Sequence, residues 1–269
     1  MTATARLSRR NQMPEASPKD RAWPLAWLGP VVLVAVWAFV ASLHLFPESL
    51  FPHPLAVGRG LVKELRSGRL VDDAIASLFR VSSGFLLAVA LGVPAGLLLG
   101  HSARARAAFL PLVNFFRSLS PLAWIPFAIL WLGIGDPPAI FLIFMAAFFP
   151  VVLSTTAAVA GIPSVYFRVA RDLGIEGPAL LREVTLPAIA PQVITALRVT
   201  AGLSWLVVVA AEMIAGSDGL GFAVWDARNG LRIDLLAAAM VVIGLIGVAL
   251  DRLLVRLTRI PSVRWGYER

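Results

Sequence analysis

Few side chains in this sequence have the types and spacing that catalysis requires. No G-x-x-x-x-G-K-S/T phosphate loop, H-E-x-x-H zinc motif or G-x-S-x-G nucleophile turn occurs, and the three histidines stand apart at positions 44, 53 and 101. An ion or proton relay would place several acids or histidines inside apolar runs, whereas Glu212 is the one clear case here. The sequence therefore predicts no catalytic residue, no metal site and no cofactor bound by this chain. Energy for any work must come from a partner.

Glu212 poses the sharpest question about a single residue. It lies about 14 residues beyond Arg198, which is roughly 20 Å along a helix and therefore near the outer end of its apolar run. An ionisable group at such a depth normally faces the interior of a bundle or water. Two roles stay open: part of an outer gate, or a structural anchor paired with Arg80 or Arg228. A direct contact with an anionic solute is not expected, because the two charges would repel.

A compact charged segment, residues 168–187, lies between two long apolar runs. Ser164 is a suitable N-cap for a short helix over 165–173, and Gly174 can adopt the left-handed conformation that ends it. Pro178 would begin a second helix and Pro187 would stop it. The pattern predicts a bent, rigid elbow of two short helices joined at Gly174.

The first of these short helices would be amphipathic. Its apolar face comprises Tyr166, Val169, Ala170 and Leu173, and the charges beside that face are Arg168, Arg171 and Asp172. Such a helix suits docking into a groove of another protein, where apolar anchors supply affinity and charges set orientation. Spacing alone leaves open whether the segment docks in this way or is an ordinary surface loop.

The elements around these residues are those of an all-α membrane protein. Hydrophobic residues make up 58% of the 269 positions and charged residues 15%, unlike a soluble globular domain. The apolar runs are too long for barrel strands, so helices are expected. Six spans are predicted, at about 25–46, 80–100, 112–135, 138–160, 193–216 and 234–256. The loop 161–191, a disordered tail over 1–24 and a basic tail over 259–269 complete the organisation, with 25–258 as the membrane domain.

The net charge of +8 follows from membrane topology and does not indicate a nucleic-acid partner. If six spans alternate from a cytoplasmic amino terminus, most lysines and arginines lie on the inner side, as the positive-inside rule requires. Both termini and the 161–191 loop would then be cytoplasmic. The first apolar run is longer than that of a signal peptide, so we expect it to remain as a span.

Two of the predicted spans have internal features. Small residues recur at every fourth position of the second span, which predicts a face for close helix packing: Gly84, Ala88, Gly92, Gly96 and Gly100. Pro121 and Pro126 interrupt the third span, and such a break is tolerated only against protein or a water-filled cavity. We therefore expect the third and fifth spans to line a pathway, with these contacts: Asn114, Ser118, Ser120, Trp124, Ser204 and Trp205. Most of them could equally be helix-packing residues.

The 168–187 segment resembles the "EAA" loop of bacterial ABC-importer permeases. Their pattern is Glu-Ala-Ala, three residues, Gly, nine residues, Ile, one residue and Leu-Pro; this chain has Arg168-Val169-Ala170, Gly174, Val184 and Leu186-Pro187 at that spacing. The nitrate/sulfonate/taurine branch of the family is similar over further segments: 77–81 with 84–85, 121–126, 131–136, 146–150, 202–205 and 208–213. The resemblance covers about residues 22–260.

This resemblance implies a type I ABC-importer permease of six transmembrane helices in a bacterial inner membrane. It further implies a second copy of the chain, two copies of a separate ATPase that holds ATP and Mg²⁺, and an extracytoplasmic binding protein. The solute would be a small anion such as a sulfonate, taurine or nitrate. The loop helix, 165–174, would dock on the ATPase, and Leu186-Pro187 would fix the return into the fifth span.

One departure from the family pattern is plain. Arg168 stands where the family has glutamate, which implies a changed charge on the ATPase surface that faces it.

The alternative function, a secondary transporter driven by an ion gradient, would call for inverted repeats with paired broken helices. The two halves of this sequence are unlike, since only one of them contains the elbow.

Overall fold

The computed structural model describes residues 23–45, 47, 48 and 50–257, and no strand occurs among them. The basic tail predicted at 259–269, and all but the last two residues of the tail predicted at 1–24, lie outside this part. The helices are α1 (Trp23–Ser42), α2 (Pro54–Ser67), α3 (Arg69–His101), α4 (Ala103–Ser118), α5 (Ile125–Leu132), α6 (Asp136–Ala160), α7 (Ser164–Asp172), α8 (Gly177–Leu180), α9 (Leu186–Ala215), α10 (Leu220–Asn229) and α11 (Ile233–Leu257). A 3₁₀ turn, Pro121–Trp124, precedes α5, and a π-helical turn, Leu181–Thr185, joins α8 to α9.

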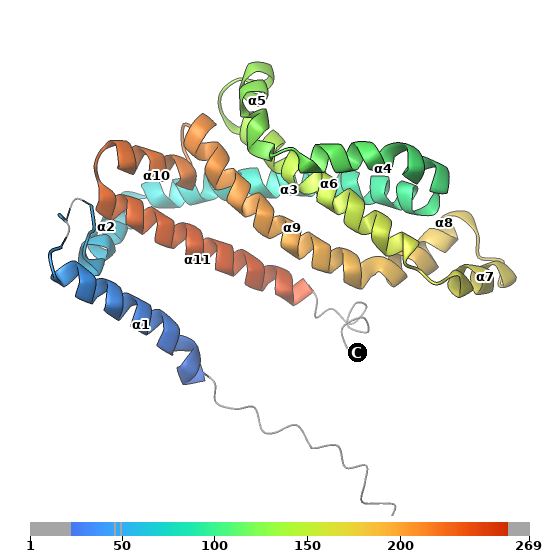
Figure 1. The fold of residues 1–269 in the computed structure, drawn as a ribbon, viewed down its shortest axis with the longest axis horizontal. Coiled ribbons are helices and arrows are strands. Elements are labelled where there is room, and N and C mark those ends of the chain that lie inside the picture. The colour runs from blue at the N-terminus through green and yellow to red at the C-terminus, as the bar shows by residue number, and fades with distance from the viewer. Residues whose placement is uncertain (1–22, 46, 49, 258–269) are drawn as a thin grey trace, which may run out of the picture. The chain divides into compact units, whose positions relative to one another are not determined.

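The chain divides into two compact units, residues 1–56 and 57–269. In the first unit, the indole N–H of Trp37 on α1 donates a hydrogen bond to the carbonyl oxygen of Pro52 at 3.2 Å. The second unit contains the helices from α3 to α11. Within it, α6 contacts both α3 and α9, and α9 contacts α11 (Figure 1). These four helices form the bundle that positions every residue discussed below.

Among the described residues, four stretches of helix are long and apolar enough to cross a bilayer: α3, α6, α8 with α9 as one run over Gly177–Ala215, and α11. The pair formed by α4 and the Pro121–Leu132 helix would be a fifth, bent by 86°. Residues 28–42 of α1 form a shorter apolar helix. The predicted all-α membrane class is confirmed, and six spans remain compatible with these elements.

The packing face predicted on the second span is confirmed. A Cβ atom at Gly84 would lie 2.8 Å from Cβ of Ile143, and one at Gly100 would lie 2.5 Å from Cβ of Val159. Between them, Gly92 faces Val151 and Gly96 faces Thr155. The residue numbers on α3 and on α6 increase together from one contact to the next, so the two helices run parallel and keep one constant register. Glycine allows this approach because any side chain would push the two backbones apart.

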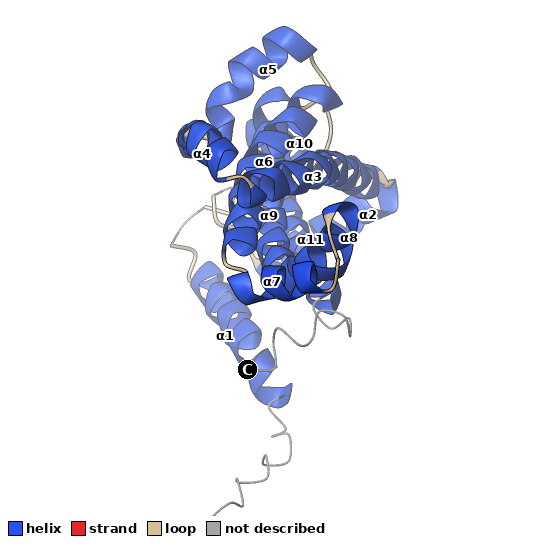
Figure 2. Cartoon of the chain, turned by 90° about the vertical axis from the view of Figure 1, so that its right-hand side faces the viewer, coloured by secondary structure: helices blue, strands red, loops and turns tan. Residues whose placement is uncertain are grey.

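Several helices differ in length from the predicted spans. Helix α3 begins at Arg69, well before position 80, so its 33 residues extend about 50 Å and exceed a bilayer core of about 30 Å. The predicted span at 112–135 is two helices that meet at the sharp bend. Figure 2 shows α5 projecting away from α3 and α6. Helix α10 was not predicted.

The prediction that Pro187 stops a helix was also wrong. The chain stays helical from Gly177 to Ala215, and Pro187 lies in the first turn of α9. Proline has no N–H and its ring clashes with the carbonyl four residues earlier. A wider π turn immediately before it accommodates both effects, and the N–H of Leu186 accordingly bonds to the carbonyl of Leu181. The elbow is therefore a bend at Gly174 followed by a helix that continues into the bundle.

Candidate functional site

Helix α7 forms the first half of the predicted elbow. It begins at Ser164, whose side chain makes no capping bond; Pro163 is the cap, and its carbonyl accepts the N–H of Tyr166 at 3.0 Å. The predicted role of Ser164 as N-cap is therefore wrong. Gly174 does end the helix as expected, with a φ of 71°. The N–H of Ile175 then bonds to the carbonyl of Ala170 at 2.8 Å, which satisfies a carbonyl of the last turn.

The apolar face of α7 is mostly uncovered. Tyr166 is 53% exposed, Val169 is 50% exposed and Leu173 is 71% exposed, whereas Ala170 is buried. Arg168, Arg171 and Asp172 are exposed. Leu186 and Pro187, where α9 begins, are exposed as well. Half of an amphipathic helix is thus left facing outward.

A cavity of about 730 Å³ lies beside this face. Tyr166, Val169 and Leu173 line it from α7, and Val184 and Pro187 line it from the opposite side. The lining is apolar over most of these residues, with Glu183 and Gln192 as polar members. A helix or loop of another protein could therefore contact α7 and the start of α9 together.

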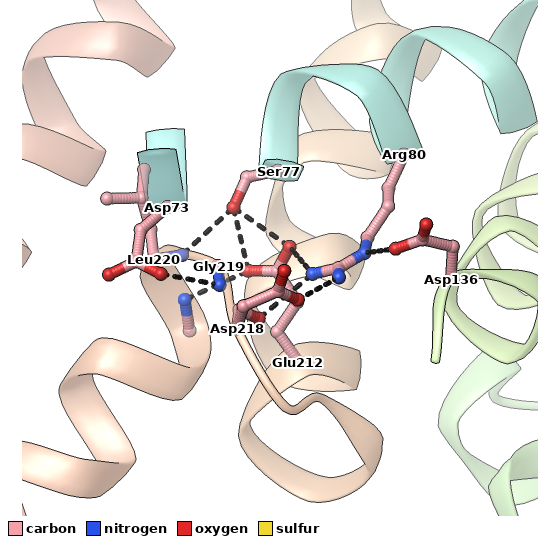
Figure 3. Close-up of polar contacts among 9 residues, drawn as sticks. Asp73, Ser77, Arg80, Asp136, Glu212, Asp218, Gly219 and Leu220 are labelled. Atoms are coloured by element: carbon pink, nitrogen blue, oxygen red, sulfur yellow. Dashed lines mark hydrogen bonds and ion pairs between the residues drawn. The ribbon is translucent and has the colours of Figure 1, made fainter. Parts of the chain in front are cut away.

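A second cluster lies at the far end of α9 and centres on Arg80, which is 1% exposed (Figure 3). Its Nε donates to Asp136 Oδ1 at 2.7 Å, at the start of α6. Its Nη1 donates to Glu212 Oε1 and to the carbonyl of Asp218, each at 2.9 Å, and its Nη2 pairs with the Asp218 carboxylate. A single guanidinium therefore joins α3, α6, α9 and the loop before α10.

The carboxylate of Glu212 is fully buried and has several donors. Ser77 Oγ lies 2.8 Å from both of its oxygens, and the N–H of Gly221 donates to Oε2 at 2.9 Å. Ser77 also accepts the N–H of Leu220 at 3.0 Å. Of the two partners proposed for Glu212 from the sequence, Arg80 is the one that the structure places beside it.

The loop glycines make this cluster possible. Gly219 has a φ of 99°, and a Cβ there would lie 2.5 Å from the carboxyl carbon of Glu212. At Gly221 a Cβ would lie 2.2 Å from the carbonyl oxygen of Val209. The N–H of Gly219 donates to Asp73 Oδ1 at 2.9 Å, one turn of α3 before Ser77. Only glycine at these positions lets the backbone approach the buried charges so closely.

The charge balance of this cluster disfavours binding of an anion. Arg80 is surrounded by the carboxylates of Glu212, Asp136 and Asp218, of which the last two are about half exposed. Nearby, Arg69 and Arg232 both pair with Asp226 on α10, at 2.7 and 2.6 Å. The hydrogen bond from Arg69, with a further contribution from Arg232, holds the pKa of Asp226 below its ordinary value. Arg69 also lies 3.9 Å from the carboxylate of Asp73, so two acids face these two cations within the chain.

The predicted pathway residues fall into two groups that the structure does not bring together. Asn114, Ser118 and Ser120 are exposed around the end of α4, and Trp124 is partly buried in an aromatic cluster with Phe116 and Trp131. Ser204 is fully buried and donates to the carbonyl of Thr200 at 3.0 Å, and Trp205 is buried and donates to the carbonyl of Ile243 at 3.2 Å. The polar atoms of these last two residues are thus bonded within the chain.

Comparison with known proteins supplies the context for these sites. Residues 89–260 match the family described as "Binding-protein-dependent transport system inner membrane component". The chain is 36% identical over 277 residues to the bicarbonate transport system permease protein CmpB of Synechococcus elongatus, covering 95% of this chain and 97% of that one. It is 35% identical over 225 residues to the taurine transport system permease protein TauC of Escherichia coli, covering 82% of each.

A solved structure has the same fold. The chain superimposes on a chain of the MetNI methionine ABC transporter, described in inward-facing conformations, with a TM-score of 0.63. The match covers 71% of this chain and 94% of that chain, and the two sequences are 21% identical. This likeness supports the helical architecture described above.

Proposed function

We infer that this chain, which belongs to the family of binding-protein-dependent transport system inner membrane components, is the membrane-spanning permease subunit of an ABC importer. It is a transport subunit, and family membership implies a separate ATPase and a solute-binding protein as partners. The exposed apolar face of α7 is the observation that indicates a mechanism. Large apolar side chains at the end of a membrane bundle normally mark a contact with another protein.

We propose that α7 docks on the ATPase and receives its closing motion. Tyr166, Val169 and Leu173 would supply the apolar contact, and ATP with Mg²⁺ would reside on the partner. Arg168 and Arg171 are exposed beside that face. Because Arg168 replaces the glutamate of the family pattern, the ATPase surface opposite it should be acidic. The docking end would then be cytoplasmic, as would both termini, in keeping with the positive-inside rule.

Leu173→Asp tests the docking proposal. A charge at this site would have to be desolvated in the contact, so ATPase copurification and solute-stimulated ATP hydrolysis should fall about tenfold or more. The chain would be purified and reconstituted with its ATPase and binding protein, using taurine, an alkanesulfonate, nitrate and bicarbonate as solutes. Gly174→Pro should act in the same way, since proline cannot adopt a φ of 71°.

Leu231→Asp is the matched control for this experiment. Leu231 is equally exposed but lies in the turn after α10, at the opposite end of α11 from α7. It should leave copurification and stimulation unchanged. Normal stimulation in the Leu173→Asp complex would contradict docking through α7.

We propose that the solute is a small anion, such as bicarbonate or a sulfonate. Support comes from the names of the two relatives, which are a bicarbonate and a taurine permease. The pathway would lie between two copies of this chain, along the bent α4–α5 pair. Asn114, Ser118, Ser120 and Trp124 remain its candidate contacts, because their side chains are not enclosed within the protomer.

Cysteine labelling tests this pathway. The sequence has no cysteine, so each introduced thiol is the sole reactive site. Ser118→Cys should react with a water-soluble maleimide about tenfold faster than Ser204→Cys, because thiol reactivity depends on exposure. A high solute concentration should slow only the reaction at position 118. Equal rates at both positions would remove α4 from the pathway.

A further inference from the structure

His101 lies at the junction between α3 and the 161–191 loop. It is the last residue of α3, and its ring lies beside two elements of the 161–191 loop. The ring packs edge-on against Phe167 of α7, with centroids 6.2 Å apart and an interplanar angle of 78°. Its Nε2 lies 3.2 Å from Oγ1 of Thr185, the last residue of the π-helical turn. The ring therefore contacts both halves of the elbow.

Geometry determines the direction of these hydrogen bonds. Nδ1 of His101 lies 2.9 Å from the carbonyl oxygen of Leu97, which can only accept. The proton of a neutral ring must therefore reside on Nδ1, and Nε2 accepts the hydroxyl proton of Thr185. The first bond holds the ring against its own helix, and the second reaches across to the loop. The two bonds have separate tasks, and they can be removed separately.

Thr185 is a fixed point for such a contact. Its side chain is fully buried, and it is the last residue of the π turn, two positions before Pro187. A π turn changes the rotational register of a helix, so the segment before it faces a different direction from α9. A hydrogen bond at its last residue fixes where that change occurs.

We propose that His101 is a positioning residue for coupling, which ties the end of α3 to the 161–191 loop through Thr185 and Phe167. The proposal rests on the docking role of α7 given above. Helix α7 is joined covalently to α6, and α6 is locked to α3 by the glycine register. The contacts of His101 with Phe167 and Thr185 add a direct connection between the end of α3 and the 161–191 loop. Motion received by α7 then moves α3 and α6 together, whereas without the tie α7 could swing at Gly161 and Gly174 alone.

Two pairs of variants separate the hydrogen bond between His101 Nε2 and Thr185 from the hydrogen bond between His101 Nδ1 and the carbonyl of Leu97. The amide of glutamine can replace Nε2, so His101→Gln can keep the Thr185 contact; asparagine is shorter and can replace only the Nδ1 bond to Leu97. On the other side, Thr185→Ser keeps the hydroxyl and Thr185→Val removes it at nearly constant volume. His101→Asn and Thr185→Val should therefore behave alike, and His101→Gln and Thr185→Ser should behave like the unmodified chain.

The test measures ATP hydrolysis stimulated by the loaded binding protein in the reconstituted complex. His101→Asn and Thr185→Val should each reduce stimulation about two- to tenfold, the range expected for one hydrogen bond. Their combination should be no worse than either alone, because both remove the same interaction. A single nitroxide at Ser164→Cys should become more mobile in the two defective variants and remain unchanged in the two conservative ones.

The same experiment distinguishes this proposal from the docking proposal. The His101 and Thr185 variants should still copurify with the ATPase, whereas Leu173→Asp should not. Full stimulation in His101→Asn and Thr185→Val would overturn the positioning role while leaving docking intact. Loss in all four variants, together with a lowered melting temperature, would also overturn it, because that result indicates only a packing role.

Discussion

Arg80→Ala is expected to lower the free energy of unfolding by about 3–5 kcal/mol, the range found when one partner of a buried ion pair is removed. The variant would leave the fully buried carboxylate of Glu212 without its cation. It would also free Asp136 and Asp218 to repel Glu212 and each other. Because one guanidinium bonds α3 to α6, α9 and the loop before α10 (Figure 3), the loss should loosen this end of the bundle as a unit.

Thermal unfolding in detergent, followed by the fluorescence of the eight tryptophans, measures this effect. Arg232→Ala is the matched control, since Arg232 also pairs with an aspartate but is partly exposed and shares Asp226 with Arg69. Its cost should be about 0–1 kcal/mol, as for a surface pair. Arg80→Lys should fall between the two, because an ammonium keeps the charge but cannot hold three partners in a planar fork. A melting temperature for Arg80→Ala equal to that of the control would contradict the prediction.

Glu212→Ala decides between the two roles left open for that residue. We propose the anchor, because its carboxylate is fully buried and accepts hydrogen bonds from Ser77, Arg80 and the N–H of Gly221. An anchor predicts that melting temperature and transport fall together. A melting temperature that stays unchanged while transport is lost would identify a gate instead.

The pairing of Glu212 could be predicted because a charge inside an apolar run requires a partner. The remaining members of the cluster were missed. Asp136 and Ser77 each carry no signal of such a contact in the sequence by themselves. A usable signal did exist on α3: Asp73, Ser77 and Arg80 continue the glycine stripe at spacings of three and four. That spacing places them on the same buried face.

The observed helix boundaries differ from the predicted ones where a charged residue was assumed to end a span. Arg69, Asp72 and Asp73 lie outside the longest uncharged run, yet the helix includes them. Two of these charges have partners in distant segments, since Arg69 pairs with Asp226 and Asp73 accepts the N–H of Gly219. Such contacts between residues more than a hundred positions apart cannot be deduced from local composition. The prediction that Pro187 ends a helix failed because a π turn accommodates this proline.

The pathway residues show a different limit. Helix α9 is apolar around most of its circumference, so the sequence could not tell which side faces its neighbours. The polar atoms of Ser204 and Trp205 bond within the chain, to the carbonyls of Thr200 and Ile243. The exposed Asn114 and Ser118 lie on α4, just before the break that could be predicted from Pro121 and Pro126.

Gly96→Ala should strongly disrupt the packing of α3 against α6. Its Cβ would lie 2.5 Å from Cβ of Thr155 and 2.8 Å from the carbonyl oxygen of Val152, and real Cβ atoms do not approach so closely. Neither contact atom is the end of a flexible side chain, so α3 and α6 must move apart. Separation would break the constant register over the rest of the stripe. The expected loss is about 3 kcal/mol, the upper part of the range for overpacking, measured by thermal unfolding in detergent.

Other glycines of the same chain provide a graded series. At Gly92 the nearest atom to a Cβ is the side-chain Cγ1 of Val151 at 3.0 Å, which can shift, so Gly92→Ala should cost less. Gly202 in α9 has nothing within 4 Å, and alanine there should be neutral or stabilising by up to about 1 kcal/mol, because it favours helix over glycine. The order of melting temperatures should follow the free space at each site. If Gly96→Ala and Gly202→Ala melt at the same temperature, the close approach of α3 and α6 cannot be what holds this bundle together, and the path proposed from α7 to α3 through α6 loses its rigid step.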